Sequence, residues 1–194
     1  WGDKGPPNMS WGWNVPMVSA EIPYMHVALC GQGMTGHISV VSGGGTIQVP
    51  GDHATIQGAI DAATDGDTIS IAAGTYLEYD LALSDKGITL SGATDEDGSP
   101  AVIIDAQQQG RVMTIAGESA SGLAPLVEHL VFTGGSSQFP GGGLNCTNSN
   151  AFIRNCHFTD NASGMNGGGV YHSGGSTVGP PPHVVARFTR CQFT

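Results

Sequence analysis

The chain has 194 residues, of which 31 are Gly and 11 are Pro, and only 11% are charged. This length suffices for one domain with a sizeable core, and so much glycine with so few charges disfavours a helical fold. Six Lys and Arg against 16 Asp and Glu give a net charge of -10. No nucleic-acid partner is expected, because phosphate binding draws on clustered basic residues. No apolar run approaches the ~20 residues that span a bilayer, so no transmembrane segment is expected either.

Residues 1–45 are predicted to form an irregular N-terminal arm. All three Trp residues and four of the 11 Pro residues lie here, without a clean hydrophobic period. An exposed Trp is unfavourable unless it is buried somewhere, so the arm either docks on a partner or packs on its own domain. The second alternative, packing on its own domain, is preferred.

Residues 46–194 are predicted to form a separate domain that begins with a short helix. Apolar residues at helical spacing are Ile56, Ala59, Ile60 and Ala63. This stripe predicts about ten helical residues beginning near His53 or Ala54. After a turn at 65–67 the period changes from that of a helix to that of a strand. Short alternating segments predict strands at 68–72, 88–90, 102–104 and 112–115.

The second half of the chain contains an internal repeat. The segments PLVEHLVFT, AFIRNCHFT and ARFTRCQFT align Phe132, Phe158 and Phe193. The step from Phe132 to Phe158 equals the step from the glycine triplet at 141–143 to the one at 167–169. The step from Phe158 to Phe193 is longer, and its extra residues are assigned to a loop at 174–182. Two independent markers therefore indicate one period, as in repeat architectures.

A period in the twenties, built from short strands, predicts a parallel β-solenoid whose coils stack about 4.8 Å apart. Because Val127 and Leu130 are three positions apart, a bend is expected near 128–129. Three columns of inward side chains follow from the alignment: Val127/Ile153/Phe188, Leu130/Cys156/Cys191 and Phe132/Phe158/Phe193. The same strand phase turns Leu144, Cys146, Val170 and His172 inward, and Asn145 and Tyr171 outward.

These features resemble the right-handed parallel β-helix, or pectin-lyase-like, superfamily. Residues 54–78 are similar to the amphipathic cap helix and first coil of those proteins. The repeats at 141–144 and 167–170, with Phe158-Thr159-Asp160-Asn161, resemble the GGA(I/L/V) and FxxN repeats of polymorphic-membrane-protein-like surface adhesins. The resemblance implies an all-β fold, a right-handed parallel β-helix with a short N-terminal cap helix, over residues 46–194. We expect this domain to continue beyond Thr194.

The segment Gly74-Thr75-Tyr76-Leu77-Glu78 resembles the GxYxE motif of pectin methylesterases. That resemblance implies an outward pair of Asp carboxylates further along, with Arg and Gln nearby. Residues 126–194 contain only Glu128 and Asp160, which do not align with each other. Tyr76 and Glu78 are therefore assigned structural roles, and Glu78→Gln is expected to leave folding nearly unchanged. A pectate lyase would need a calcium-binding acidic group facing a base, and no such group lies in register. No catalytic residue is assigned.

No cofactor or metal site is predicted. Residues 95–98 (Asp-Glu-Asp-Gly) lack the rest of a calcium loop and are expected to form a solvated turn. His129 and His157 are expected at matching outward positions of adjacent coils, where two imidazoles are too few for a metal. Cys156 and Cys191 lie one coil apart, a separation that permits a disulfide. Both belong to an inward apolar column, where a free Cys behaves as a small hydrophobe, so stacked thiols are preferred.

Three Asn-X-Ser/Thr sequons, at Asn8, Asn145 and Asn161, are candidate N-glycosylation sites. Asn145 is the preferred acceptor because its side chain should point outward, whereas Asn161 should be used within a turn. These features favour an extracellular or cell-surface location. We expect a non-catalytic structural or adhesive protein of a cell surface, coat, appendage or filament, with a glycan or protein partner. The alternative is a polysaccharide-active enzyme, similar to pectate lyase or pectin esterase, whose catalytic coils lie outside this segment.

The last residues, 191–194, follow the third copy of the repeat without a capping element. Soluble β proteins avoid uncovered strand edges, because such edges template association. Two alternatives are therefore open. The chain is a fragment of a longer polypeptide, or a second copy stacks on it end to end. A segment from residues 1–45 folded over the last coil would contradict both.

Overall fold

The computed structural model describes residues 44–174 and 186–194. All of them lie in the second of two units into which the chain divides, Ile38–Thr194. Apart from its last two residues, the predicted arm at 1–45 lies outside the described residues, as do Asn8 and most of the loop predicted at 174–182.

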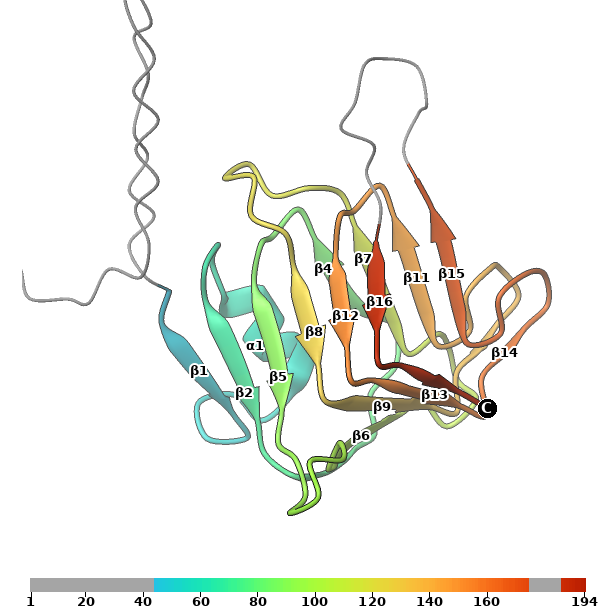
Figure 1. Cartoon of the computed structure of the whole chain (residues 1–194), viewed down its shortest axis with the longest axis horizontal. Coiled ribbons are helices and arrows are strands. Elements are labelled where there is room, and N and C mark those ends of the chain that lie inside the picture. Colours follow the sequence, from blue (N-terminus) through green and yellow to red (C-terminus); the bar gives the residue numbers. More distant parts are fainter. Residues whose placement is uncertain (1–43, 175–185) are drawn as a thin grey trace, which may run out of the picture. The chain divides into compact units, whose positions relative to one another are not determined.

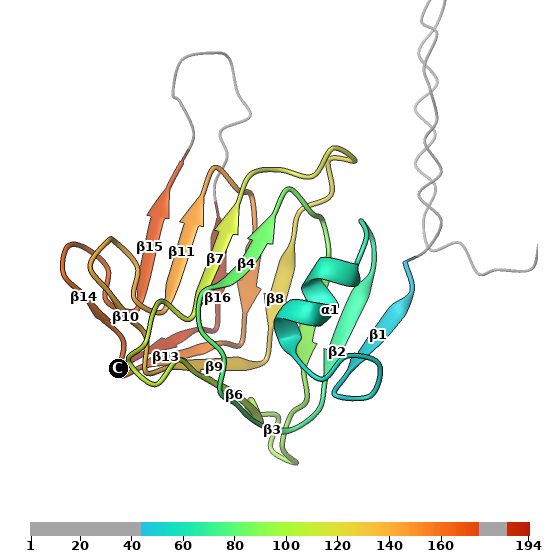
Figure 2. The same ribbon diagram turned by 180° about the vertical axis from the view of Figure 1, so that it is seen from behind.

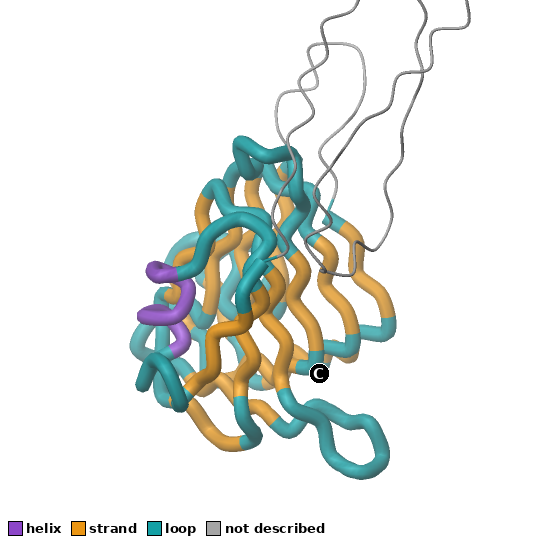
Figure 3. Tube along the Cα trace, turned by 90° about the vertical axis from the view of Figure 1, so that its left-hand side faces the viewer, coloured by secondary structure: helices purple, strands orange, loops and turns teal. Residues whose placement is uncertain are grey.

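The described residues are all-β with one short helix, and parallel strands stack into three main sheets (Figures 1 and 3). The first sheet contains, in order, β1 (Thr46–Val49), β2 (Thr68–Ile71), β5 (Thr89–Gly92), β8 (Leu126–Glu128), β12 (Phe152–Arg154) and β16 (Arg187–Thr189). The second contains β3 (Gly74–Tyr76), β6 (Val102–Asp105), β9 (Leu130–Thr133), β13 (His157–Thr159) and β17 (Gln192–Phe193). The third contains β4 (Leu81–Ser84), β7 (Met113–Ala116), β11 (Leu144–Thr147) and β15 (Val170–Ser173). A separate short pair is β10 (Ser136–Ser137) with β14 (Ala162–Ser163).

The chain passes through the first, second and third sheets in that order, and each passage is called a repeat here. Repeat 1 consists of β2, β3 and β4, repeat 2 of β5, β6 and β7, repeat 3 of β8, β9 and β11, and repeat 4 of β12, β13 and β15, while β16 and β17 belong to repeat 5. Phe132 pairs with Phe158, which pairs with Phe193. Each of the two predicted steps, from Phe132 to Phe158 and from Phe158 to Phe193, therefore leads from one residue to its partner on the neighbouring strand of the second sheet.

The inward columns are confirmed in repeats 3 and 4, whereas in repeat 5 Phe188 and Cys191 are partly buried and Phe193 is 55% exposed. Val127 and Ile153 are fully buried and face each other across β8 and β12, and Ile153 pairs with Phe188. The rings of Phe132 and Phe158 stack at 4.9 Å between centroids, and those of Phe158 and Phe193 at 5.2 Å. Stacking at nearly the strand spacing keeps the rings in contact from one repeat to the next.

The predicted bend between the first and second sheets falls at a single residue. His129, Asn155 and Arg190 occupy this position in repeats 3, 4 and 5, with φ of 57°, 49° and 55°. These values lie in the left-handed region, which a side chain enters at a cost and which packing must sustain. The corner geometry is thus imposed by the two strands that it joins, whatever residue stands there.

The glycine triplets make a close contact between repeats. A Cβ on Gly142 would lie 2.1 Å from the carbonyl oxygen of Ala162, so no side chain fits there. Gly141 and Gly167 begin the two triplets with φ of 81° and 67°. The Gly143 N–H donates to the Gly168 carbonyl at 2.9 Å, which joins one triplet to the next.

The helix α1 (Ile56–Ala62) is shorter than predicted and begins two to three residues later. The reason is its N-cap: Thr55 has extended backbone, and its hydroxyl accepts a hydrogen bond from the Gly58 N–H at 3.1 Å. Ile56, Ala59 and Ile60 are buried on one face, as the sequence predicts. Figure 2 shows α1 lying between β2 and β4, beside repeat 1.

Candidate functional site

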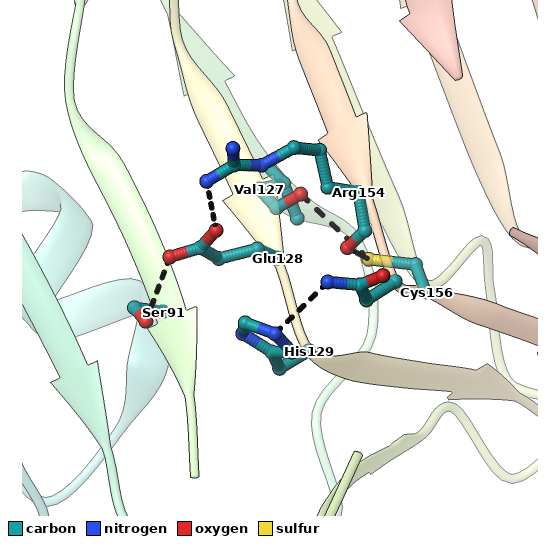
Figure 4. A network of polar contacts seen from close by, with 7 residues as sticks. Ser91, Val127, Glu128, His129, Arg154 and Cys156 are labelled. Atoms are coloured by element: carbon teal, nitrogen blue, oxygen red, sulfur yellow. Dashed lines mark hydrogen bonds and ion pairs between the residues drawn. The ribbon is translucent and has the colours of Figure 1, made fainter. Parts of the chain in front are cut away.

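Polar side chains gather on the outer face of the first sheet, where β5, β8 and β12 end (Figure 4). Glu128 pairs with Ser91 on one side and with Arg154 on the other in the strand register. The Ser91 hydroxyl donates to Glu128 Oε1 at 3.1 Å, and Arg154 Nη2 lies 2.5 Å from Glu128 Oε2. The Glu128 side chain is 14% exposed and that of Arg154 50%. The carboxylate is thus enclosed between two repeats while the guanidinium still faces solvent.

The same face continues at the corner with His129 and Asn155. Asn155 Nδ2 lies 3.0 Å from His129 Nε2, which joins repeats 3 and 4 again. The expectation that His129 and His157 occupy matching positions is wrong, because His157 pairs with Val131 in the second sheet. One repeat step on from His129 stands Asn155, so His157 lies too far along the chain to match it and falls on the next sheet.

The last two repeats add an aromatic ring and two further arginines to this face. Arg187 pairs with Phe152, and its guanidinium carbon lies 5.2 Å from the centre of the Phe152 ring. Such a distance is typical of a cation–π contact. Arg190 stands at the exposed corner that follows β16. Three of the four arginines of the chain therefore lie in neighbouring positions of repeats 4 and 5.

Among the predicted sequons, Asn161 is expected to be bonded within a turn, but its amide bonds to the preceding repeat instead. Its Oδ1 accepts from the Gly135 N–H and its Nδ2 donates to the Phe132 carbonyl, both at 2.8 Å. The Asn145 side chain is half-buried in the middle of the third sheet, and its Oδ1 accepts from the Thr147 hydroxyl at 3.0 Å. The amide of Asn161 thus bridges two repeats, while that of Asn145 bonds within its own strand.

Tyr76 and Glu78 both make contacts with the backbone. The Tyr76 hydroxyl donates to the Ala72 carbonyl at 2.9 Å. Glu78 accepts from the N–H groups of Ile56 at 2.8 Å and of Gln57 at 3.1 Å. These are free donors of the first turn of α1, so the carboxylate stabilises the helix start. The contact revises the expectation that Glu78→Gln leaves folding nearly unchanged.

Residues 95–98 form an exposed turn, as predicted. The Asp95 N–H donates to the Ser99 carbonyl, and Asp97 accepts from the Ser99 N–H at 2.9 Å. This hydrogen bond holds the pKa of Asp97 below its usual value. In the described part of the chain no three His, Cys, Asp or Glu side chains converge as metal ligands would.

The described cysteines are free thiols. Cys156 and Cys191 occupy the same column one repeat apart, as predicted, and their sulfurs lie against carbonyl oxygens of the first sheet. Burial raises the pKa of Cys156 to about 12 and that of Cys146 to about 11. Both buried thiols are therefore protonated and poorly nucleophilic at neutral pH.

Arg111 has a role that the sequence does not reveal. Its guanidinium donates to the carbonyls of Gly141 at 2.5 Å and Pro140 at 2.8 Å, and so holds the loop before β11. Burial lowers the pKa of this guanidinium. A lone Arg in a polar segment carries no sequence signal for such a contact, because its partners are main-chain carbonyls.

Comparison with known protein families, with curated proteins and with solved structures finds no match for this chain. The described residues contain no helix of the length and apolar character needed to cross a membrane.

Proposed function

We propose that the stacked repeats form a right-handed parallel β-helix and that the protein is a non-catalytic structural or adhesive protein of a cell surface. The observation that carries this proposal is the use of polar side chains between repeats. Asn161, Glu128 and Arg154 each bond to the neighbouring repeat. Parallel strands joined by crossovers are almost always right-handed, which supports the handedness.

Two candidate carboxylates, Glu78 and Glu128, are engaged in structural contacts. Glu78 accepts two helix N–H groups, and Glu128 is held between Ser91 and Arg154. A carboxylate acting as nucleophile or general base must reach the substrate instead. In the polysaccharide-active alternative, the catalytic residues lie in coils outside this segment.

A surface location agrees with the composition and with the sequons. Asn145 is the proposed glycan acceptor, because the Asn161 amide is bound on both sides by the neighbouring repeat. In a eukaryotic secretory host, glycopeptide mass spectrometry should find Asn145 modified and Asn161 bare. Modification at Asn161 alone would contradict this assignment.

The function is tested on cells and with purified protein. Antibodies should label intact cells of the source without permeabilisation, and labelling only after permeabilisation would overturn the surface role. The purified chain should leave polygalacturonate and its methyl ester unchanged, measured as unsaturated product, reducing ends and released methanol. Turnover that disappears in Glu128→Gln would establish an enzyme and overturn the non-catalytic role.

A further inference from the structure

The charges of the chain are divided sharply along the repeats. Residues 44–128 carry 13 acidic and two basic residues, whereas residues 129–194 carry one acidic and three basic residues. A chain of net charge -10 thus ends in a segment of positive sign. Such a division gives the molecule an acidic side and a basic side that attract each other in different copies.

The basic side has a defined surface, called the arginine corner here, which consists of Phe152, Arg154, Arg187 and Arg190. Arg187 lies over the half-buried Phe152 ring, and both are outward residues of adjacent strands. Arg154 is paired with Glu128, while Arg187 and Arg190 make no ion pair with the residues that the structure describes. Two exposed guanidinium groups beside an aromatic ring form a surface suited to carboxylates.

The acidic side has an equally defined counterpart, called the acidic turn here, at Asp95, Glu96 and Asp97. All three are exposed, and hydrogen bonds between residues 95 and 99 hold the turn in shape. The turn belongs to residues 93–101, which join β5 to β6 where later repeats use one corner residue. Figure 1 shows it projecting beyond the strands at the corner between the first and second sheets.

The acidic turn and the arginine corner therefore lie along the same corner of the molecule, in repeats 2 and 4–5. Three strand spacings, about 14 Å, separate repeat 2 from Arg190. Among the residues that the structure describes, no ion pair joins the two surfaces within one chain. They can meet when two copies lie side by side, displaced along the stacking direction.

We propose that the arginine corner binds the acidic turn of a second copy of this chain. The inference deepens the proposed structural role, on which it rests, by naming the partner. The contact joins two different surfaces, so each copy keeps one surface of each kind free. Such a contact does not close on itself and extends into a row of copies.

Sedimentation velocity of the full chain tests the contact. At about 0.15 M salt the Debye length is ~8 Å, which screens the long-range repulsion of the net charge and leaves short ion pairs intact. We expect concentration-dependent association there, and its loss at about 1 M salt, where the Debye length is ~3 Å. A chain that stays monomeric at every concentration under the first condition would overturn the proposal.

Charge reversal tests which surfaces meet. Arg187→Glu with Arg190→Glu, and separately Asp95→Lys with Glu96→Lys, should each weaken association by about tenfold or more. An equimolar mixture of these two variants should associate again, because the reversed corner of one meets the reversed turn of the other. Absence of this rescue, with both variants folded by circular dichroism, would overturn the pairing.

Two controls separate the contact from general charge effects and from other partners. Glu118→Lys with Asp61→Lys changes the net charge as much as the turn variant and should leave association unchanged, and an equal loss would overturn the proposal. Binding of polygalacturonate to wild type that is stronger than self-association and lost in the corner variant would also overturn it, in favour of an acidic glycan. Because purified protein is used, the result is independent of the cell labelling that tests the proposed function.

Discussion

The first and last repeats hold their turns with different chemistry. In residues 44–128, carboxylates accept backbone N–H groups from neighbouring segments. Asp67 accepts from Gly45 at 2.6 Å and Asp65 from Gly87 at 2.8 Å. In residues 129–194 a neutral amide takes the same role, since Asn161 Oδ1 accepts a hydrogen bond from the Gly135 N–H. These turns are therefore held by anions in the first half and by an uncharged amide in the second, so the turn contacts of the first half are the ones expected to weaken in acid.

The largest effect is expected in the later repeats, where three Phe rings stack in one column of the second sheet. Phe158 is fully buried between Phe132 and Phe193, so Phe158→Ala should lower the free energy of unfolding by about 3–5 kcal/mol. Denaturant melts followed by circular dichroism measure this loss. Phe193→Ala is the matched control and should cost much less, because Phe193 is 55% exposed. Equal losses for the two variants would contradict the described packing.

The uncharged Asn161 amide, which bridges repeats 3 and 4, is tested by Asn161→Ala. This change leaves the Gly135 N–H and the Phe132 carbonyl without their partner, and each unsatisfied group costs about 1–3 kcal/mol when it is shielded from water. We expect the free energy of unfolding to fall by about 2–4 kcal/mol, equally at pH 4 and pH 7. Asn161→Asp keeps the acceptor and loses the donor, so its cost should lie between those of wild type and Asn161→Ala.

An anionic contact of the first repeats is tested by Glu78→Gln. The substitution removes the charge that faces the first turn of α1 and leaves one acceptor for two N–H groups. A loss of about 1 kcal/mol is expected from hydrogen-bond and helix-dipole magnitudes. Glu118→Gln, an exposed carboxylate elsewhere in repeat 2, should change stability by less than about 0.5 kcal/mol. A Glu78→Gln protein as stable as this control would show that the cap contributes nothing.

The smallest effect is the acid dependence of the first repeats. Hydrogen bonds lower the pKa values of Asp65 and Asp67 below their ordinary 3.8 in the folded protein. A carboxyl group with a depressed folded pKa adds stability above its unfolded pKa, and this stability disappears as pH falls through the folded value. The melting temperature should therefore decline below about pH 4.

One substitution in each half tests whether the acid dependence belongs to the turn contacts of residues 44–128. Asp67→Asn should differ most from wild type at neutral pH and converge with it toward pH 2. Asn161→Ala should differ from wild type by the same amount throughout, because its amide does not titrate. Parallel melting curves for Asp67→Asn and wild type across this range would remove the distinction between the two halves.

Most of the fold in the later repeats follows from spacing in the sequence. Phe132 and Phe158 are separated by the same step as the two glycine triplets, so side chains and turns report one register. In the first repeats β4 could have been predicted as well, since Leu81 and Leu83 alternate with small residues. The strand β3 could not, because Gly74-Thr75-Tyr76 shows no alternation of buried and exposed positions.

The candidate site was predictable only in part, for the same reason. Glu128 and Arg154 are separated by one repeat step, which alone would bring them together. Ser91 is farther than one such step from Glu128, because the acidic turn and further loop residues lengthen that repeat. The repeat period therefore does not predict this contact. The sequence alone also does not reveal the contribution of Glu78 to stability. Its hydrogen-bond partners belong to a helix that begins well before it in the chain, and folding brings them together.

The step between repeats 3 and 4 is the same for the Phe column and for the glycine triplets, so this segment can be regarded as a unit that could be copied. Residues 135–160 contain one full period, from one glycine triplet and its strand to the next aromatic column. A duplicated segment of this kind would meet the original with Phe over Phe, glycine over glycine and Asn155 over Asn155 at the corner. Each added copy would lengthen the stack by one strand spacing, about 4.8 Å, without requiring any new kind of contact. Tandem duplication of this segment would therefore lengthen the stack, whereas point mutations would change only the side chains exposed on each repeat.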